Sequence, residues 1–104
     1  MTKKIKVSEL ADFDAAEYLT TDEDVAAYLT TVIQENDAAL LAAALGDIAR
    51  SRGMTQVAKD SGITREALYK ALRPGSEPRL DTVMRVCVAL GVELVVQPKR
   101  AAVG

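Results

Sequence analysis

Six side chains near the middle of the chain are suited to contact nucleic acid. They lie on one side of a predicted short helix, and they are Thr64, Arg65, Glu66, Tyr69, Lys70 and Arg73. Side chains of these types donate to phosphates and guanine edges, accept from cytosine, and pack on thymine methyl groups or sugars. This face is therefore predicted to bind DNA. The alternative is an ordinary solvated face, in which Glu66 and Lys70 form an i,i+4 pair worth only about 0.3 kcal/mol.

Two short helices within residues 54–72 are predicted to position this face. Thr55 and Thr64 are each suited to cap the start of one helix, and Gly62 to the left-handed conformation that ends the first. Ala58 precedes the glycine by four residues, where a small side chain lets the helices cross closely, and Leu68 follows it by six. This spacing is typical of a helix-turn-helix, although an ordinary helical hairpin is the alternative. The inward side is predicted to hold Ile63, Ala67, Leu68, Ala71 and Leu72.

The composition excludes several kinds of chemistry. The chain has 104 residues, enough for one domain with a small core, and it contains no histidine and one cysteine. A zinc site, a disulfide framework and histidine-based catalysis are therefore excluded or nearly so, and we expect no enzyme and no cofactor. Because apolar residues make up 49% but include one Phe, three Tyr and no Trp, we expect a core of Leu, Val, Ile and Ala in close-packed helices.

The start of the chain and its apolar runs give an expected location. No run approaches the roughly 20 apolar residues of a membrane span, and residues 1–7 lack the long apolar segment of a signal peptide. A cytoplasmic protein without a membrane partner is expected.

The charge is divided along the chain. Residues 1–48 carry three lysines against ten carboxylates, a net charge of −7, whereas residues 49–104 carry ten basic against five acidic residues, a net charge of +5. The two halves are thus predicted to have different partners, the basic half DNA and the acidic half a basic protein. The alternative for the acidic half is a solvated face that keeps the protein soluble.

Helix signals also occur outside the central pair. A short helical turn is predicted at residues 15–19, and a helix is predicted to begin at Thr21. Another is predicted at about 38–52, with Asp37 as its cap. A last helix ends at Gly91, with an apolar stripe of Leu80, Val83, Met84, Cys87 and Val88. Residues 92–97 are predicted to form a strand, which needs a mate from residues 5–7, a second subunit or another protein.

Most of the chain resembles a known family. Residues 11–97 are similar to the addiction-module antidote proteins, relatives of HigA-type antitoxins with a phage-repressor-like helix-turn-helix. The likeness lies in Asp14–Leu19, Ala42–Arg50, Gly53–Ala58, Ser61–Leu72, Thr82–Val83 and Ala89–Gly91. The resemblance implies an all-α, five-helix lambda-repressor-like domain with an N-terminal helical extension and a short C-terminal β-strand. It also implies an antitoxin that neutralises a RelE/ParE/HigB-like toxin and represses its own operon.

The resemblance and the charge division together extend the predicted sites. A glutamine in the first helix of the motif often contacts phosphate in phage repressors, but Gln56 precedes Ala58 by two residues where those proteins usually leave four. Thr55 and Gln56 are both among the predicted DNA-binding residues. Residues 9–37 carry nine acids and no basic residue, which suits a basic toxin. The predicted toxin-binding residues are Phe13, Asp14, Glu17, Tyr18, Leu19, Asp22 and Glu23.

These sites give a predicted organisation and an alternative function. Residues 1–36 are the acidic arm and helix, residues 37–97 the DNA-binding domain and residues 98–104 a tail. We expect a homodimer on operator DNA, formed through the last helix and the predicted strand. The alternative is a stand-alone prophage-type repressor without a toxin partner.

Overall fold

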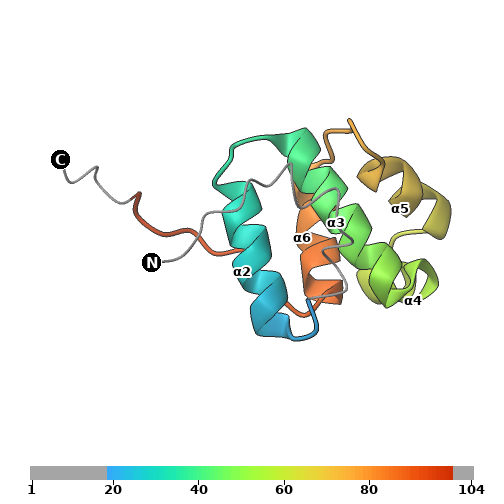
Figure 1. Ribbon diagram of the computed structural model, residues 1–104. Helices are drawn as coiled ribbons and strands as arrows, with labels where there is room; N and C mark the ends of the chain where they lie inside the picture. Colours follow the sequence, from blue (N-terminus) through green and yellow to red (C-terminus); the bar gives the residue numbers. More distant parts are fainter. Residues whose placement is uncertain (1–18, 100–104) are drawn as a thin grey trace.

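The computed structural model describes residues 19–99, which form five α-helices and no strand. In chain order these are α2 (Asp22–Ile33), α3 (Ala38–Arg52), α4 (Met54–Ser61), α5 (Arg65–Leu72) and α6 (Leu80–Ala89) (Figure 1). The predicted all-α fold is confirmed for this part of the chain. None of these helices is long and apolar enough to cross a membrane.

The helix starts follow the capping signals in the sequence. The Thr21 hydroxyl accepts from the Asp24 backbone N–H at 3.0 Å and begins α2. The Asp37 carboxylate accepts from the backbone N–H groups of Ala39 and Leu40 at 3.0 and 3.2 Å and begins α3. Each side chain satisfies donors that the first turn of a helix leaves unpaired. Local sequence therefore sets where these two helices begin.

One residue joins α3 to α4. Gly53, with φ of 103°, is both the C-cap of α3 and the N-cap of α4. A side chain is strained at this φ, so glycine permits the sharp change in direction between the two helices. As a result, α4 packs on α3 immediately after the turn. The prediction that Thr55 caps α4 is wrong, because Thr55 lies within this helix.

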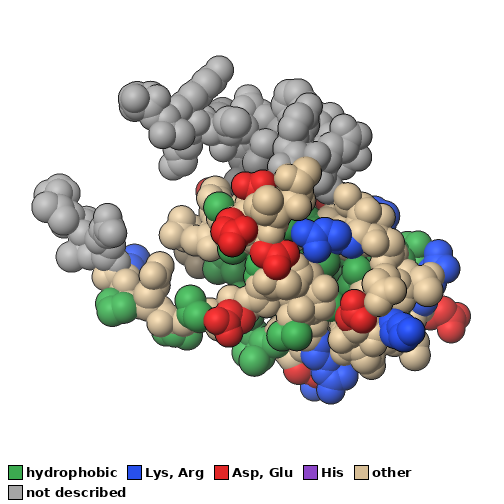
Figure 2. All heavy atoms as spheres, turned by 90° about the horizontal axis from the view of Figure 1, so that it is seen from below, with side chains coloured by type: hydrophobic (Ala, Val, Ile, Leu, Met, Phe, Trp, Pro, Cys, Tyr) green, Lys and Arg blue, Asp and Glu red, His purple; other side chains and the backbone are tan. Residues whose placement is uncertain are grey.

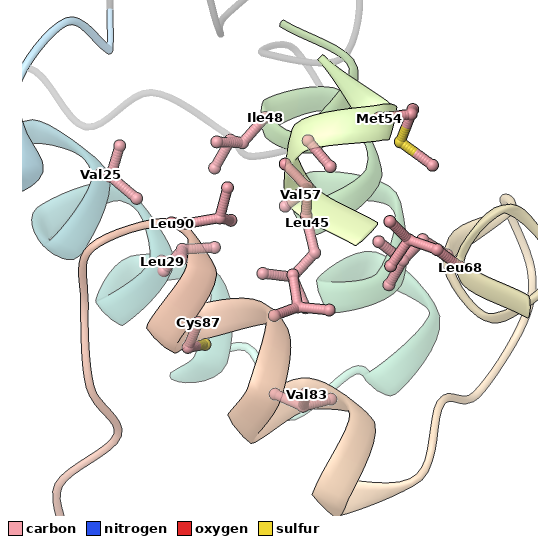
Figure 3. Packing of buried hydrophobic residues seen from close by; sticks show 14 of the residues in the cluster. Val25, Leu29, Leu45, Ile48, Met54, Val57, Leu68, Val83, Cys87 and Leu90 are labelled. Carbon is pink, nitrogen blue, oxygen red and sulfur yellow. The ribbon is translucent and has the colours of Figure 1, made fainter. Parts of the chain in front are cut away.

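A single core joins all five helices. Val25 and Leu29 of α2 and Leu90, which follows α6, point toward one another, and Leu45 and Val57 lie between them and Leu68 of α5 (Figure 3). Close packing also brings α3 against α5: a Cβ added at Gly46 would lie 2.7 Å from the Leu72 carbonyl oxygen. The helix that carries the predicted DNA-binding face therefore rests on a rigid support.

The predicted apolar stripe of α6 is wrong in part. Val83 and Cys87 are buried as expected, but Val86 and Leu90 complete the buried face. Leu80, Met84 and Val88 are instead 69%, 50% and 68% exposed. The helix is apolar on two sides, so periodicity alone did not distinguish the side that faces the core.

The predicted strand at residues 92–97 is absent from the described part of the chain. The Val92 N–H donates to the Cys87 carbonyl at 2.9 Å. Residues 93–97 then line a hollow beside Leu29 and Ile33 of α2, without a backbone hydrogen bond to any described residue. Leu94, Val95 and Val96 are exposed, Val96 completely. A strand needs a neighbour to pair with, and the helices of residues 19–99 offer none.

Candidate nucleic-acid interface

The turn between α4 and α5 is fixed by hydrogen bonds to one carbonyl. The Ala58 oxygen accepts from the backbone N–H groups of Gly62 and Ile63 at 3.0 and 3.2 Å and from the Ser61 hydroxyl at 3.2 Å. Gly62 has φ of 73°, the left-handed conformation that the sequence predicts. Ala58 and Leu68 are buried beside it, also as predicted. We call residues 54–72 the α4–α5 corner.

Thr64 orients the start of α5. Its hydroxyl accepts from the Ala67 backbone N–H at 3.1 Å, as expected for an N-cap. The side chain is exposed but its oxygen already stabilises the helix. Thr64 therefore positions the face as well as belonging to it.

Arg65 spans the corner from α5 to the start of α4. Its Nη1 donates to the Thr55 hydroxyl at 3.1 Å and its Nη2 to the Tyr69 hydroxyl at 3.3 Å. The guanidinium carbon also lies 5.5 Å from the centre of the Tyr69 ring, within cation–π range. Three residues of the predicted DNA-binding set are thereby brought together. The i,i+4 spacing of Arg65 and Tyr69 was visible in the sequence, but the contact with Thr55 depends on the tertiary turn.

The other cations of the face have no carboxylate partner among residues 19–99. Ion pairs in that range join Arg50 to Asp47 and Arg79 to Asp81. Lys70 and Arg73 are exposed, and the Glu66–Lys70 pair of the alternative interpretation does not form. Their positive charge is available to an anion.

Two details of the corner differ from the sequence analysis or add to it. Ala67 was predicted to point inward but is exposed, because α5 is packed from one side by Leu68 and Leu72. Gln56 is exposed and its Nε2 donates to the Asp60 carboxylate at 2.9 Å. The sequence analysis did not include Asp60, although its i,i+4 spacing from Gln56 could have revealed it.

The predicted toxin-binding residues are only partly described. Phe13, Asp14, Glu17 and Tyr18 lie outside the described residues, and Leu19 packs half-buried against the core. Asp22 and Glu23 are exposed at the start of α2. They line a hollow of about 550 Å³ whose other lining residues are Ala26, Val88, Gly91, Val92 and Glu93. Glu93 was not predicted from the sequence, because it lies far along the chain from Asp22 and Glu23.

The two charge types are unevenly distributed over the face of the molecule that Figure 2 shows. Most acidic side chains gather on the left in Figure 2, the side of α2, and most Lys and Arg side chains on the right, the side of the α4–α5 corner. Burial raises the pKa of Tyr28, with a further contribution from the Asp47 charge, and burial also raises the pKa of the Cys87 thiol. Both groups belong to the packed interior and not to the corner face.

Comparison with known proteins defines the class of this chain. Residues 9–98 match the model of a family described as "Probable addiction module antidote protein", and the chain belongs to that family. Membership implies a toxin partner and a role in a toxin–antitoxin system. A protein of Haemophilus influenzae, described only as uncharacterized, is 49% identical over 94 residues, which cover 90% of this chain and 97% of that protein. No solved structure matches the chain.

Proposed function

We propose that this protein is a HigA-like antitoxin that binds operator DNA through the α4–α5 corner, represses its own operon and neutralises a RelE/ParE/HigB-like toxin. In this proposal the corner is a lambda-repressor-like helix-turn-helix with α5 as the recognition helix. The protein acts by binding and is not an enzyme. The observation that carries the DNA-binding part is Arg65, which Thr55 and Tyr69 hold on an exposed face. The neighbouring cations have no carboxylate partner among residues 19–99.

Arg65 is suited to read a guanine. A guanidinium has five N–H donors, and the two hydrogen bonds of Arg65 within the corner leave others for the O6 and N7 atoms of the base. Because Thr55 and Tyr69 already restrict the side chain, less conformational entropy is lost on binding. Thr55 and Tyr69 are positioning residues in this proposal, and both also reach the DNA surface.

The remaining polar residues of the predicted DNA-binding face position the protein on the DNA. Lys70 and Arg73 are exposed cations without a carboxylate partner in the described range, so each can neutralise a phosphate. Gln56 donates to phosphate after its amide leaves Asp60. Glu66 accepts from a cytosine amino group.

The acidic half contacts the toxin. In this proposal the toxin binds its nucleic-acid substrate through a basic groove, and Asp22 and Glu23 attract that groove and cover it. Leu19, together with Phe13 and Tyr18, supplies the apolar anchors, and Asp14 and Glu17 add charge. We also propose that residues 92–97 become a strand once a second strand pairs with them.

Titration of the DNA upstream of the gene tests the DNA-binding part. Arg65→Ala is expected to weaken operator binding by about 1–3 kcal/mol and to relax specificity at one base pair. Lys70→Ala is expected to weaken binding to all DNA sequences alike. It is also expected to lower the salt dependence of the affinity by about one phosphate contact. The matched control is Lys99→Ala, which removes one charge from the C-terminal segment, on the opposite side of the molecule from α5 (Figure 1).

The proposal fails if the Arg65→Ala and Lys70→Ala variants bind like the parent at the same salt concentration. Co-expression with the product of the neighbouring gene tests the toxin part separately. Co-purification and cell rescue are expected. A protein that binds operator but rescues no cells would favour the stand-alone repressor instead.

A further inference from the structure

The outer side of α6 carries an apolar stripe without a partner in the described part of the chain. Leu80, Met84 and Val88 are 69%, 50% and 68% exposed and follow one another at intervals of four residues. Residues four apart lie on the same side of a helix, so these three form one continuous line. The buried residues Val83, Val86 and Cys87 face the other way, into the core. An aligned apolar stripe is a mark of an interaction surface, whereas single exposed apolar residues are not.

We propose that this stripe is the contact between two copies of this chain, whose α6 helices pack antiparallel about a two-fold axis at Met84. The stripe is symmetric about its centre, because Leu80 lies four residues before Met84 and Val88 four residues after it. In an antiparallel pair, Leu80 of each copy therefore faces Val88 of the second copy, and the two Met84 side chains meet on the axis. A two-fold contact requires this kind of self-complementary surface.

The charges beside the stripe favour the same orientation. Asp81 and Arg85 each lie one residue beyond a member of the stripe. In the antiparallel pair, Arg85 of one copy comes within about two residues along the axis of Asp81 of the second copy, a shift of about 3 Å that an arginine spans easily. The two-fold axis repeats this ion pair, so the dimer contains it twice. In a parallel pair the charged flanks of the two helices would lie on opposite sides of the seam and could not form this ion pair, which disfavours that arrangement.

Both charges are available for such a contact. Arg85 is exposed and forms no ion pair within residues 19–99. Asp81 accepts from Arg79 at 3.2 Å, but the two side chains are 57% and 86% exposed, and such surface pairs rearrange easily. The interface thus uses a residue whose present partner is weakly held.

The interface deepens the proposed function, since it supplies the dimer that a two-fold operator requires. Only the seven residues 73–79 separate the end of α5 from the start of α6, so pairing of α6 relates two α5 helices by symmetry. A helix of ten residues is about 15 Å long, and one such pair covers less than the ~1,200–2,000 Å² of a standard interface. We therefore expect a weak dimer that DNA strengthens.

Sedimentation equilibrium of the full chain without DNA tests the proposal. The parent is expected to form a dimer within a protein concentration range of about 1–500 µM, as suits a small interface. Met84→Glu places two carboxylates on the axis and is expected to weaken the dimer at least about tenfold. The matched control is Ile33→Glu, an exposed apolar residue of α2 that lies outside the stripe, and it is expected to leave the dimer unchanged.

A charge reversal tests the orientation without altering the apolar stripe. Asp81→Arg and Arg85→Asp are each expected to weaken the dimer, and the double variant is expected to restore it. The charge reversal tests the antiparallel interface even if the Met84→Glu variant unfolds and loses its helical circular dichroism signal. A parent that stays monomeric throughout the concentration range, a Met84→Glu variant as dimeric as the parent, or a double variant without rescue would each overturn the proposal.

Failure of the interface and failure of the proposed function remain distinguishable. The sedimentation experiment contains no DNA and no toxin, so its result does not depend on either. A dimeric parent that binds no operator would remove the DNA-binding function and leave the interface in place.

Discussion

The α4–α5 corner and the start of α2 hold their charged groups in opposite ways. At the corner, Arg65 is fixed by two hydrogen bonds and by the Tyr69 ring. At the start of α2, Asp22 and Glu23 are exposed and form no ion pair with any described residue. A fixed donor suits the recognition of one partner geometry, whereas free carboxylates attract any basic surface. The contrast matches the two proposed partners, a defined DNA sequence and a basic protein.

The two regions nevertheless share one core. Substitutions in this core are expected to have the largest effect of those considered, a loss of stability. Leu29 of α2 is 3% exposed and Leu68 of α5 is 0% exposed. Leu29→Ala and Leu68→Ala are each expected to lower the free energy of unfolding by about 2–5 kcal/mol, because each leaves a cavity in a packed interior. Urea unfolding should show one transition for both variants. Thr30→Ala, an exposed neighbour on α2, serves as the control.

A different result would separate the two regions. If Leu29→Ala left the unfolding of the corner unchanged, or if unfolding occurred in two steps, residues 37–97 would be an independent domain, as the sequence-based boundary at residue 36 supposes. In a shared core, removal of residues 1–36 would delete the buried residues Val25, Leu29 and Val32 and unfold the protein. That truncation therefore cannot isolate the toxin contact.

The next largest effect is expected on operator affinity, in a test of whether Tyr69 holds Arg65 in place. Tyr69→Phe keeps the ring and removes the hydroxyl that accepts from Arg65, so operator binding should weaken by about 1 kcal/mol. In an Arg65→Ala background, the same change should cost almost nothing, because its partner is gone. Four operator titrations at one salt concentration complete this double-mutant cycle. Additive losses would show that Tyr69 contacts DNA independently of Arg65.

A smaller effect is expected at the acidic end. The double variant Asp22→Asn, Glu23→Gln should bind the toxin with an association rate several-fold lower and less dependent on salt. The dissociation rate should change little, since apolar anchors hold the complex. Stopped-flow mixing with purified toxin measures both rates, and operator titration of the same variant controls for the corner. An unchanged association rate would mean that these carboxylates do not attract the toxin and serve only to keep the protein soluble.

Helix starts and the turn were predicted correctly from the sequence where a single local signal determines them. Thr21, Asp37 and Thr64 cap helices as expected, and Gly62 adopts the left-handed turn. Each of these features depends on a hydrogen bond or a φ angle within a few residues. The family was also predicted correctly, because long runs of the chain carry the resemblance. The HigA-like subtype, the toxin class and the operator remain predictions.

The sequence did not decide features that depend on distant neighbours. The predicted stripe of α6 combined the buried residues Val83 and Cys87 with three exposed ones, because both sides of that helix are apolar. Residues 92–97 carry strand-forming side chains, but no strand of residues 19–99 pairs with them. The bond from Arg65 to Thr55 joins residues ten apart and forms only once the corner has folded. In each case tertiary packing, and not local preference, chose the outcome.

The smallest expected effect concerns the interior that both regions share. Burial raises the pKa of the Cys87 thiol, which is 1% exposed. As pH rises past the thiol's ordinary value, about 8.5, the unfolded chain loses this proton before the folded protein does. Deprotonation then favours the unfolded state, so the thiol's contribution to stability is complete below that pH and declines above it. Urea unfolding of the parent and of a Cys87→Ala variant, at several pH values from neutral upward, should show the steeper decline in the parent. Equal slopes would mean that the thiol ionises alike in both states and that the core around α6 admits water.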